Sequence, residues 1–330
     1  MSLPPNSVGE KCIMGLGRDY AAARYIDMWA MPGVHPSNIE FLQQLKTADT
    51  NHFTTHMDCV GTISEQDPDS RSWKKSHLIG IRTDVWKPSN QELQRTLKSL
   101  QADRRKELKR EIKRSGRLSE KQRRELEERA SSDEIMNLKA ADLVTRRLII
   151  KLFKTTGTRT RWVGTLEQIT TSEIHNSLGS RRPLLSFAVM LPRTQMLTQL
   201  QQNHRTLRIP SVFSGCYSDD GTLWNLLLKK RWIALGAHFD LYADGQNIGE
   251  IDSRVLTFGA DCTLRLRDHE LTEDTGFVNV MTLFAASVGY HKAMYRSLRR
   301  RIKSTLAGES YRHVVEDEEL RLRHNGRSAA

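Results

Sequence analysis

The sequence predicts an α+β fold with a mostly β core, in which antiparallel strands enclose an apolar helix near the C-terminus. Two observations lead to this prediction. Residues 277–290 carry no charge and are apolar around the whole helical circumference, so a helix there must be buried on all sides. The preceding third of the chain consists of short segments joined by turns containing Asp-Gly, which is typical of an antiparallel meander. Because these strands lead directly into the helix, we expect the sheet to surround it.

Composition limits the partners that the chain can have. The 330 residues carry a formal net charge of +12 with a pI of about 9.7, which favours nucleic acid or an anionic membrane surface. Four cysteines occur singly, at Cys12, Cys59, Cys216 and Cys262, so neither a disulfide framework nor a zinc ribbon is indicated. The first residues contain no apolar run behind a basic start. We therefore expect a cytoplasmic protein that is not an integral membrane protein.

Residues 1–75 are predicted to form a mainly helical N-terminal region. Residues 19–31 have helical composition, and Pro32-Gly33 would end that helix. Ser37 or Asn38 would then cap a second short helix over residues 39–47. Both helices are expected to be amphipathic packing elements.

A polar cluster in this region, NHFTTHMDC, is a candidate metal site. On a helix, His52 and His56 would share a face and Cys59 would lie near it, which is a spacing that suits transition-metal ligands. The residues between the histidines favour a strand instead, where the two histidines would still share a face. The alternative is two partly exposed histidines and a buried thiol. No cofactor is predicted elsewhere.

A strand over residues 77–86 is followed by a very different segment. Pro88 ends the strand, and Ser89 or Asn90 would cap the helix that follows. Residues 91–130 contain fourteen Lys or Arg against eight Asp or Glu, which is half of the net charge of the chain. Leucines form only a thin stripe, so we expect a charged helical hairpin inserted at 90–130. Its candidate anion-binding residues are Arg104, Arg105, Lys109, Arg110, Lys113 and Arg114; the alternative is a solvated insertion.

Strand patterns dominate from residue 146 onward. Residues 146–153 and 158–169 would form a hairpin, and the apolar run 184–191 reads as a buried strand. Residues 193–206 are polar and predict a short helix or a crossing loop. Further strands are expected over residues 222–230, 231–243, 247–252 and 255–268.

A single helix is predicted over residues 277–302, followed by a polar tail at 303–330. Its second half keeps a narrow apolar stripe and becomes basic, which adds Arg299, Arg300 and Arg301 as candidate anion-binding residues. The residues expected to pack inside the sheet are Phe277, Val280, Met281, Leu283, Phe284 and Val288.

The C-terminal third also resembles a known family. A glycine before an aromatic strand (Gly236, Phe239), an acidic-Gly turn (Asp244-Gly245), an Ile-Asp pair (Ile251-Asp252) and the late apolar helix resemble the LURP-one and phospholipid-scramblase type of domain. That type is related in fold to the tubby C-terminal domain. The resemblance implies a closed, tubby-like barrel of about twelve antiparallel strands over residues 77–302, with the helix threaded through its centre. The cysteine-rich segment and proline-rich tail of scramblases are absent.

The sequence favours a non-enzymatic binding module. No nucleophile elbow, phosphate-binding loop or His-Glu-x-x-His motif is present. The first hypothesis is that the basic surface meets an anionic membrane lipid or a protein partner. The alternative is nucleic acid, bound by the hairpin and the basic end of the helix. Phe284-Ala285 and Gly289, followed by Tyr295 and Leu298, also fit a loose helix-turn-helix template.

Overall fold

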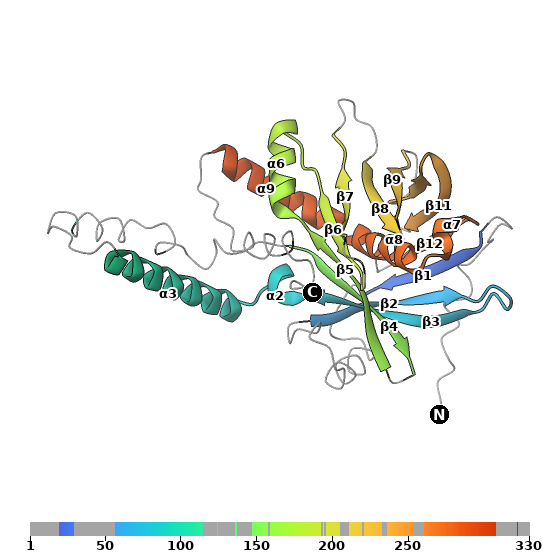
Figure 1. Cartoon of the computed structure of the whole chain (residues 1–330), viewed down its shortest axis with the longest axis horizontal. Coiled ribbons are helices and arrows are strands. Elements are labelled where there is room, and N and C mark those ends of the chain that lie inside the picture. Colours follow the sequence, from blue (N-terminus) through green and yellow to red (C-terminus); the bar gives the residue numbers. More distant parts are fainter. Residues whose placement is uncertain are drawn as a thin grey trace.

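A computed structural model gives the fold of the chain (Figure 1). The residues that the structure describes are 20–29, 57–114, 147–157, 159–192, 196–204, 211–219, 221–232, 236–253 and 261–307, with single positions at 124, 136, 194 and 322.

Twelve strands within these residues form one closed antiparallel barrel. Each strand pairs with its neighbours in chain order, and β1 closes the barrel by pairing with both β2 and β12. Closure leaves no unpaired sheet edge. The strands are β1 Ala22–Met28, β2 Met57–Gln66, β3 Trp73–Arg82, β4 Ile149–Thr156, β5 Arg159–Gln168, β6 Ser186–Met190, β7 Thr198–Gln202, β8 Val212–Asp219, β9 Thr222–Lys230, β10 Phe239–Ala243, β11 Gln246–Ser253 and β12 Cys262–Leu266.

Helix α8, Thr275–Ser287, lies inside the barrel (Figure 1). Every residue from Phe277 to Ser287 is buried. Phe284 contacts Phe187 of β6, Phe213 of β8 and Phe239 of β10, with ring centroids 6.3, 5.0 and 5.4 Å away. On other sides, Cys262 of β12 donates to the carbonyl of Ala285, and a Cβ at Gly164 of β5 would lie 2.9 Å from Leu283. Contacts on so many strands confirm the predicted enclosed helix.

A short element and an N-cap fix where α8 begins. Helix α7, Glu270–Glu273, precedes it, and the Asp274 carboxylate accepts hydrogen bonds from the backbone N–H groups of Gly276 and Phe277. The Tyr217 hydroxyl of β8 donates to the same carboxylate. Because an N-cap satisfies backbone donors that the helix leaves unpaired, Asp274 and Tyr217 together anchor the first turn of α8 to the barrel wall.

The helix continues beyond the barrel after a short irregularity. A 3-10 turn, η3 at Val288–Tyr290, links α8 to α9, His291–Leu306. The helical span therefore includes the predicted 277–302 but is longer at both ends, from Thr275 to Leu306, and it is not one regular helix. The helix-turn-helix alternative is wrong, since its first helix is enclosed by strands and cannot pack beside a second helix on a surface. All six predicted core residues are buried: Phe277, Val280, Met281, Leu283, Phe284 and Val288.

The N-terminal helix predicted over residues 19–31 is wrong, because Ala22–Met28 is strand β1. The side chains alternate, with Ile26 and Met28 in the interior core and Tyr25 and Asp27 turned the other way. Pairing on both sides overrides the helical propensity of the alanines. The barrel therefore begins well before residue 77. The second predicted helix, at residues 39–47, lies outside the described residues.

Several other boundaries also differ from the prediction. The strand expected at residues 77–86 is β3, which starts earlier, and Thr83–Trp86 forms the short helix α2 instead. The segment 193–206, predicted as helix or loop, contains strand β7. Its Leu200 is the only large apolar side chain among five residues, so the pattern is weak. Strand β8 and helix α6, Thr170–Ser180, were not predicted. The β4–β5 hairpin, the buried strand β6 and the Asp244-Gly245 turn are as expected.

A second hydrophobic cluster covers the outer wall of the barrel. It includes Met57, Phe153 and Trp162. Leu152 and Val163, the chain neighbours of the last two, belong to the interior core. Leu322, which is fully buried, packs in the same cluster. The region 303–330 was predicted to be a polar tail, yet this one described residue lies against the wall.

Helix α3, Asn90–Arg114, points away from the barrel (Figure 1). Ser89 caps it as predicted, because its hydroxyl accepts from the N–H of Glu92 while the Glu92 carboxylate accepts from the N–H of Ser89. Gln101 donates to the carbonyl of Met136, so a later part of the chain lies beside α3. The rest of the hairpin predicted at 90–130 falls outside the described residues.

Candidate anion-binding surface

The outer face of α9 is strongly basic. Lys292, Arg296, Arg299, Arg300 and Lys303 are all exposed, and their spacing puts them on one side of the helix. Helix α9 contains no acidic residue. Met294, Leu298 and Ile302 on the opposite side of α9 are buried in the core. Because that side faces the barrel, the basic side faces solvent.

A concave pocket lies beside this stripe. It has a volume of about 450 Å³ and is lined by Arg182, Pro183, Gln202, Ser211, Tyr295 and Arg299. The Tyr295 hydroxyl donates to the Gln202 side chain at 2.8 Å and lies 3.5 Å from the Ser211 hydroxyl. Burial raises the pKa of Tyr295, so the phenol stays neutral and can donate a hydrogen bond. Two guanidinium groups and neutral hydroxyls suit an anionic oxygen.

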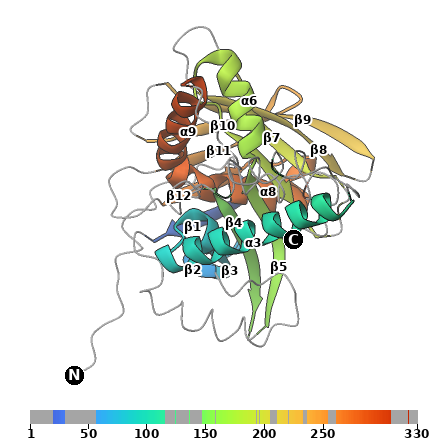
Figure 2. The ribbon, with the colours of Figure 1, turned by 90° about the vertical axis from the view of Figure 1, so that its left-hand side faces the viewer.

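The turn after α6 adds more positive charge to this end of the molecule. Arg181 ends α6 in a left-handed conformation with φ of 53°, and both Arg181 and Arg182 are exposed. Helix α6 packs against α9. We call Arg181, Arg182, Lys292, Arg296, Arg299, Arg300 and Lys303 the barrel-end surface. Figure 2 looks onto this end and shows α6 and α9 next to each other, with α3 on the same side of the molecule.

Two large apolar side chains are exposed at the same end. Trp232 is 79% exposed and Leu306 is 66% exposed. Trp232 follows the end of β9, where the N–H of Lys230 donates to the carbonyl of the pocket residue Ser211. Leu306 is the last residue of α9. Single exposed apolar side chains are common on protein surfaces, and these two are accessible to a partner that approaches this end.

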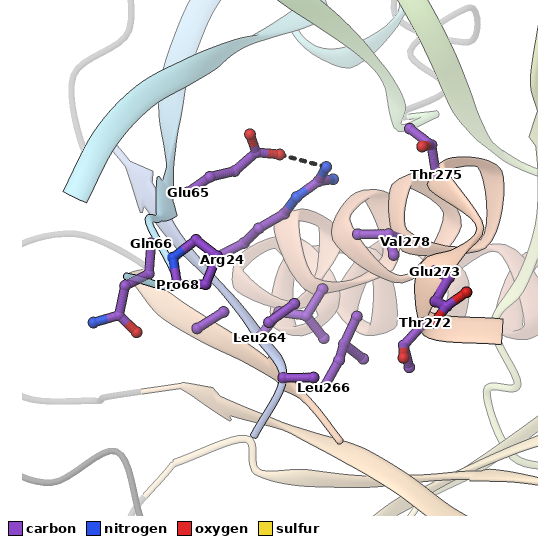
Figure 3. Close-up of a pocket in the computed structure, with 13 residues that line it drawn as sticks. Arg24, Glu65, Gln66, Pro68, Leu264, Leu266, Thr272, Glu273, Thr275 and Val278 are labelled. Atoms are coloured by element: carbon purple, nitrogen blue, oxygen red, sulfur yellow. Dashed lines mark ion pairs between the residues drawn. The ribbon is translucent and has the colours of Figure 1, made fainter. Parts of the chain in front are cut away.

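The opposite mouth of the barrel holds a second cavity, of about 270 Å³ (Figure 3). Its floor is apolar, with Leu264, Leu266 and Val278, while Glu65 and Glu273 lie on its rim. The buried Arg24 guanidinium donates to Asn279 and Thr282 of α8, both at 2.9 Å, and pairs with Glu65 at 2.6 Å. Burial lowers the pKa of Arg24, while Glu65 opposes that shift. Arg24 therefore clamps the central helix to β1 and β2.

Replacing Arg24 by Met is expected to destabilise the protein by about 2–3 kcal/mol, because it removes charged hydrogen bonds and leaves the buried Asn279 oxygen without its donor. Urea denaturation measures the change. In a double-mutant cycle with Glu65→Gln, the two losses should be coupled by about 1 kcal/mol or more. Strictly additive losses would show that the pair does not act as a clamp.

The predicted anion-binding residues fall into two groups. Arg299 and Arg300 belong to the barrel-end surface, but Arg301 does not, because it is only 4% exposed. Arg105, Lys109 and Arg110 are exposed on α3, whereas Arg104 is half-buried and pairs with Glu107 at 3.0 Å. Lys113 and Arg114 are in α3, but their side chains lie outside the described part. The basic character of α9 could be predicted from the sequence. The proximity of Arg182 and Trp232 to this end of the barrel could not, because these residues are distant from α9 in the chain.

The candidate metal site cannot be assembled from the described residues. His52 and His56 lie outside them, and Cys59 is fully buried in the outer hydrophobic cluster. Burial raises the pKa of the Cys59 thiol to about 11, which disfavours the thiolate that binds metal. Across the described ranges, no group of three His, Cys, Asp or Glu side chains could hold a metal ion.

Comparisons with protein-family models, curated proteins and solved structures found no match. Among the described helices, none is both long and apolar enough to cross a membrane.

Proposed function

We propose that this protein is a non-enzymatic binding module that docks on anionic membrane surfaces through the barrel-end surface. The proposal rests on one observation above all: α9 presents five exposed cations and no acidic residue, next to a pocket formed with Arg182. Each basic residue held near an anionic bilayer contributes roughly 1 kcal/mol. The exposed Trp232 and Leu306 supply apolar contacts of the kind that sit in the interfacial region of a bilayer.

The resemblance to LURP-one, scramblase and tubby domains supports the same proposal. We infer a tubby-like barrel from the quoted C-terminal motifs and from twelve antiparallel strands around a C-terminal helix. In this proposal the protein acts in the cytoplasm and carries no cofactor. The pocket of about 450 Å³ would take an anionic headgroup oxygen, with the guanidinium groups of Arg182 and Arg299 as donors.

Vesicle sedimentation tests the proposal. The protein should bind vesicles of phosphatidylserine and phosphatidylcholine, and should not bind phosphatidylcholine alone. Arg296→Glu/Arg299→Glu removes two favourable charges and introduces two repulsive ones, so affinity should fall by at least about 30-fold. Trp232→Ala should weaken binding several-fold.

The matched control is Arg159→Glu/Arg161→Glu, which makes the same charge change at exposed positions of the β4–β5 hairpin. That hairpin tip lies far from α9 (Figure 1), so vesicle binding should be retained. If control and barrel-end variants lose affinity equally, binding depends on net charge alone and the proposed surface is wrong. Binding to a protein partner in place of vesicles would likewise reject it.

A further inference from the structure

Helix α3 carries a second basic stripe that the proposed function does not use. Arg95, Lys98, Arg105, Lys106, Lys109 and Arg110 are exposed. At about 100° per residue these six positions fall within less than half of the helical circumference. Leu93 and Leu97 are buried on the opposite side, and Gln101, near that side, is bonded to Met136. The packed face and the basic face are thus separate, and the basic face looks into solvent.

Most of this charge is not neutralised locally. Lys106 pairs with Asp103 at 3.2 Å. Among the described residues, no carboxylate lies within ion-pair distance of Arg95, Lys98, Arg105 or Lys109. The acidic Asp103 and Glu107 lie toward one flank of the stripe, since their angular positions differ from those of Lys98 and Lys109. Four of the six cations, Arg95, Lys98, Arg105 and Lys109, are therefore not neutralised by a described carboxylate.

The composition of the stripe indicates the class of partner. Ser99 and Ala102 lie among the basic residues, and the stripe has no aromatic or large aliphatic side chain. Protein interfaces depend on such anchors at their centre, and interfacial membrane helices need an exposed apolar face. Those features are present at the barrel end, in Trp232 and Leu306, and missing here. A stripe that offers charge and no apolar anchor suits a regular polyanion such as a nucleic-acid backbone.

We propose that the basic stripe of α3 binds the phosphate backbone of double-stranded nucleic acid without reading its sequence. From Arg95 to Arg110 the stripe is about 22 Å long, at about 1.5 Å per residue. A stripe of that length can reach several phosphates of a duplex, which carries one charge per about 3.4 Å of axis on each strand. The inference uses other residues than the proposed function and does not depend on it.

Fluorescence anisotropy with a short labelled RNA duplex, and with a DNA duplex of equal length, tests this inference on the full chain. Affinity should fall steeply with salt, with a slope close to −0.9 for each phosphate contacted. Lys98→Glu/Arg105→Glu/Lys109→Glu should reduce that slope by about 3 and weaken binding at least 100-fold on both duplexes. All three positions are exposed, and circular dichroism checks that the variant is folded.

Two control variants locate the binding site. Arg159→Glu/Arg161→Glu and Arg296→Glu/Arg299→Glu should both keep duplex affinity within a few-fold. No duplex binding at low salt would overturn the inference, and so would loss of binding in the barrel-end variant with retention in the α3 variant. A third outcome is that the wild type does not bind duplexes and the α3 variant loses vesicle binding. The stripe would then contribute to membrane binding, so the nucleic-acid proposal would fail while the proposed function would stand.

Discussion

Replacing Phe284 by Asp is expected to unfold the whole barrel. Phe284 is fully buried and its ring contacts Phe187, Phe213, Phe239 and His291. A carboxylate there would have no partner, and an unpaired buried charge costs more than the total stability of an ordinary domain. Because the strands close around α8, they cannot keep their packing once the helix leaves. Far-UV circular dichroism and urea denaturation of the purified variant measure the effect.

Two further variants separate burial of charge from loss of packing. Phe284→Ala removes the ring without adding charge and should cost about 3–5 kcal/mol, leaving a folded protein with a lower urea midpoint. Leu223→Asp is the matched control, because Leu223 lies on β9 and is 55% exposed. Its effect should stay within about 1 kcal/mol. If Phe284→Asp unfolded cooperatively at the wild-type midpoint, the helix could not be the centre of the fold.

The central helix could be predicted because its signal is independent of context. An uncharged segment that is apolar on every side has one stable place in water, which is inside other structure. The strands β9 to β12 were readable for a related reason, since Asp244-Gly245 adopts φ values of 45° and 87° that only certain residues tolerate. Local chemistry decided both elements.

The elements that the sequence did not reveal depend on distant partners. Strand β1 begins with alanines and contains Arg24, which looks like a solvent-facing residue. Only in the barrel does Arg24 meet Asn279 and Thr282 of α8. The same holds for the pocket beside the barrel-end surface, where Arg182, Ser211 and Tyr295 come from three separate parts of the chain. A site assembled by closure of the barrel leaves no local pattern.

Two buried histidines create the second large expected effect, a loss of stability in acid. Burial, with the positive charge of Lys230, lowers the pKa of His291 to about 3. Its ring lies among Phe187, Phe213 and Phe284, and Nε2 is 3.2 Å from the Ser287 hydroxyl. His77 is equally enclosed: burial and the charges of Arg24 and Lys154 lower its pKa to about 3. Both imidazoles must stay neutral in the folded protein.

The sign of the effect follows from proton binding. Between the folded pKa of about 3 and the unfolded value of about 6.5, the unfolded chain binds more protons than the native protein. The free energy of unfolding therefore falls as pH falls through this window, by up to about 1.4 kcal/mol per pH unit for each histidine. Above pH of about 6.5 both states hold neutral imidazoles, and these two residues add no pH dependence.

His291→Phe isolates one of the two contributions. Phenylalanine suits the aromatic surroundings, and the Ser287 hydroxyl keeps its bond to the carbonyl of Phe284, so no polar group is left unpaired. We expect urea denaturation from pH 8 to pH 4.5 to show a growing difference in the free energy of unfolding. Relative to the wild type, the variant should become more stable by about 1–1.4 kcal/mol for each pH unit below about 6.5. His204→Gln changes a histidine at an exposed position, so the pH dependence of its free energy of unfolding should match that of the wild type. If the stability of His291→Phe instead fell with pH in parallel with that of the wild type, the buried imidazole would accept its proton without opening the barrel. Water would then have to reach the space between α9 and the rings of Phe187, Phe213 and Phe284 in the native state.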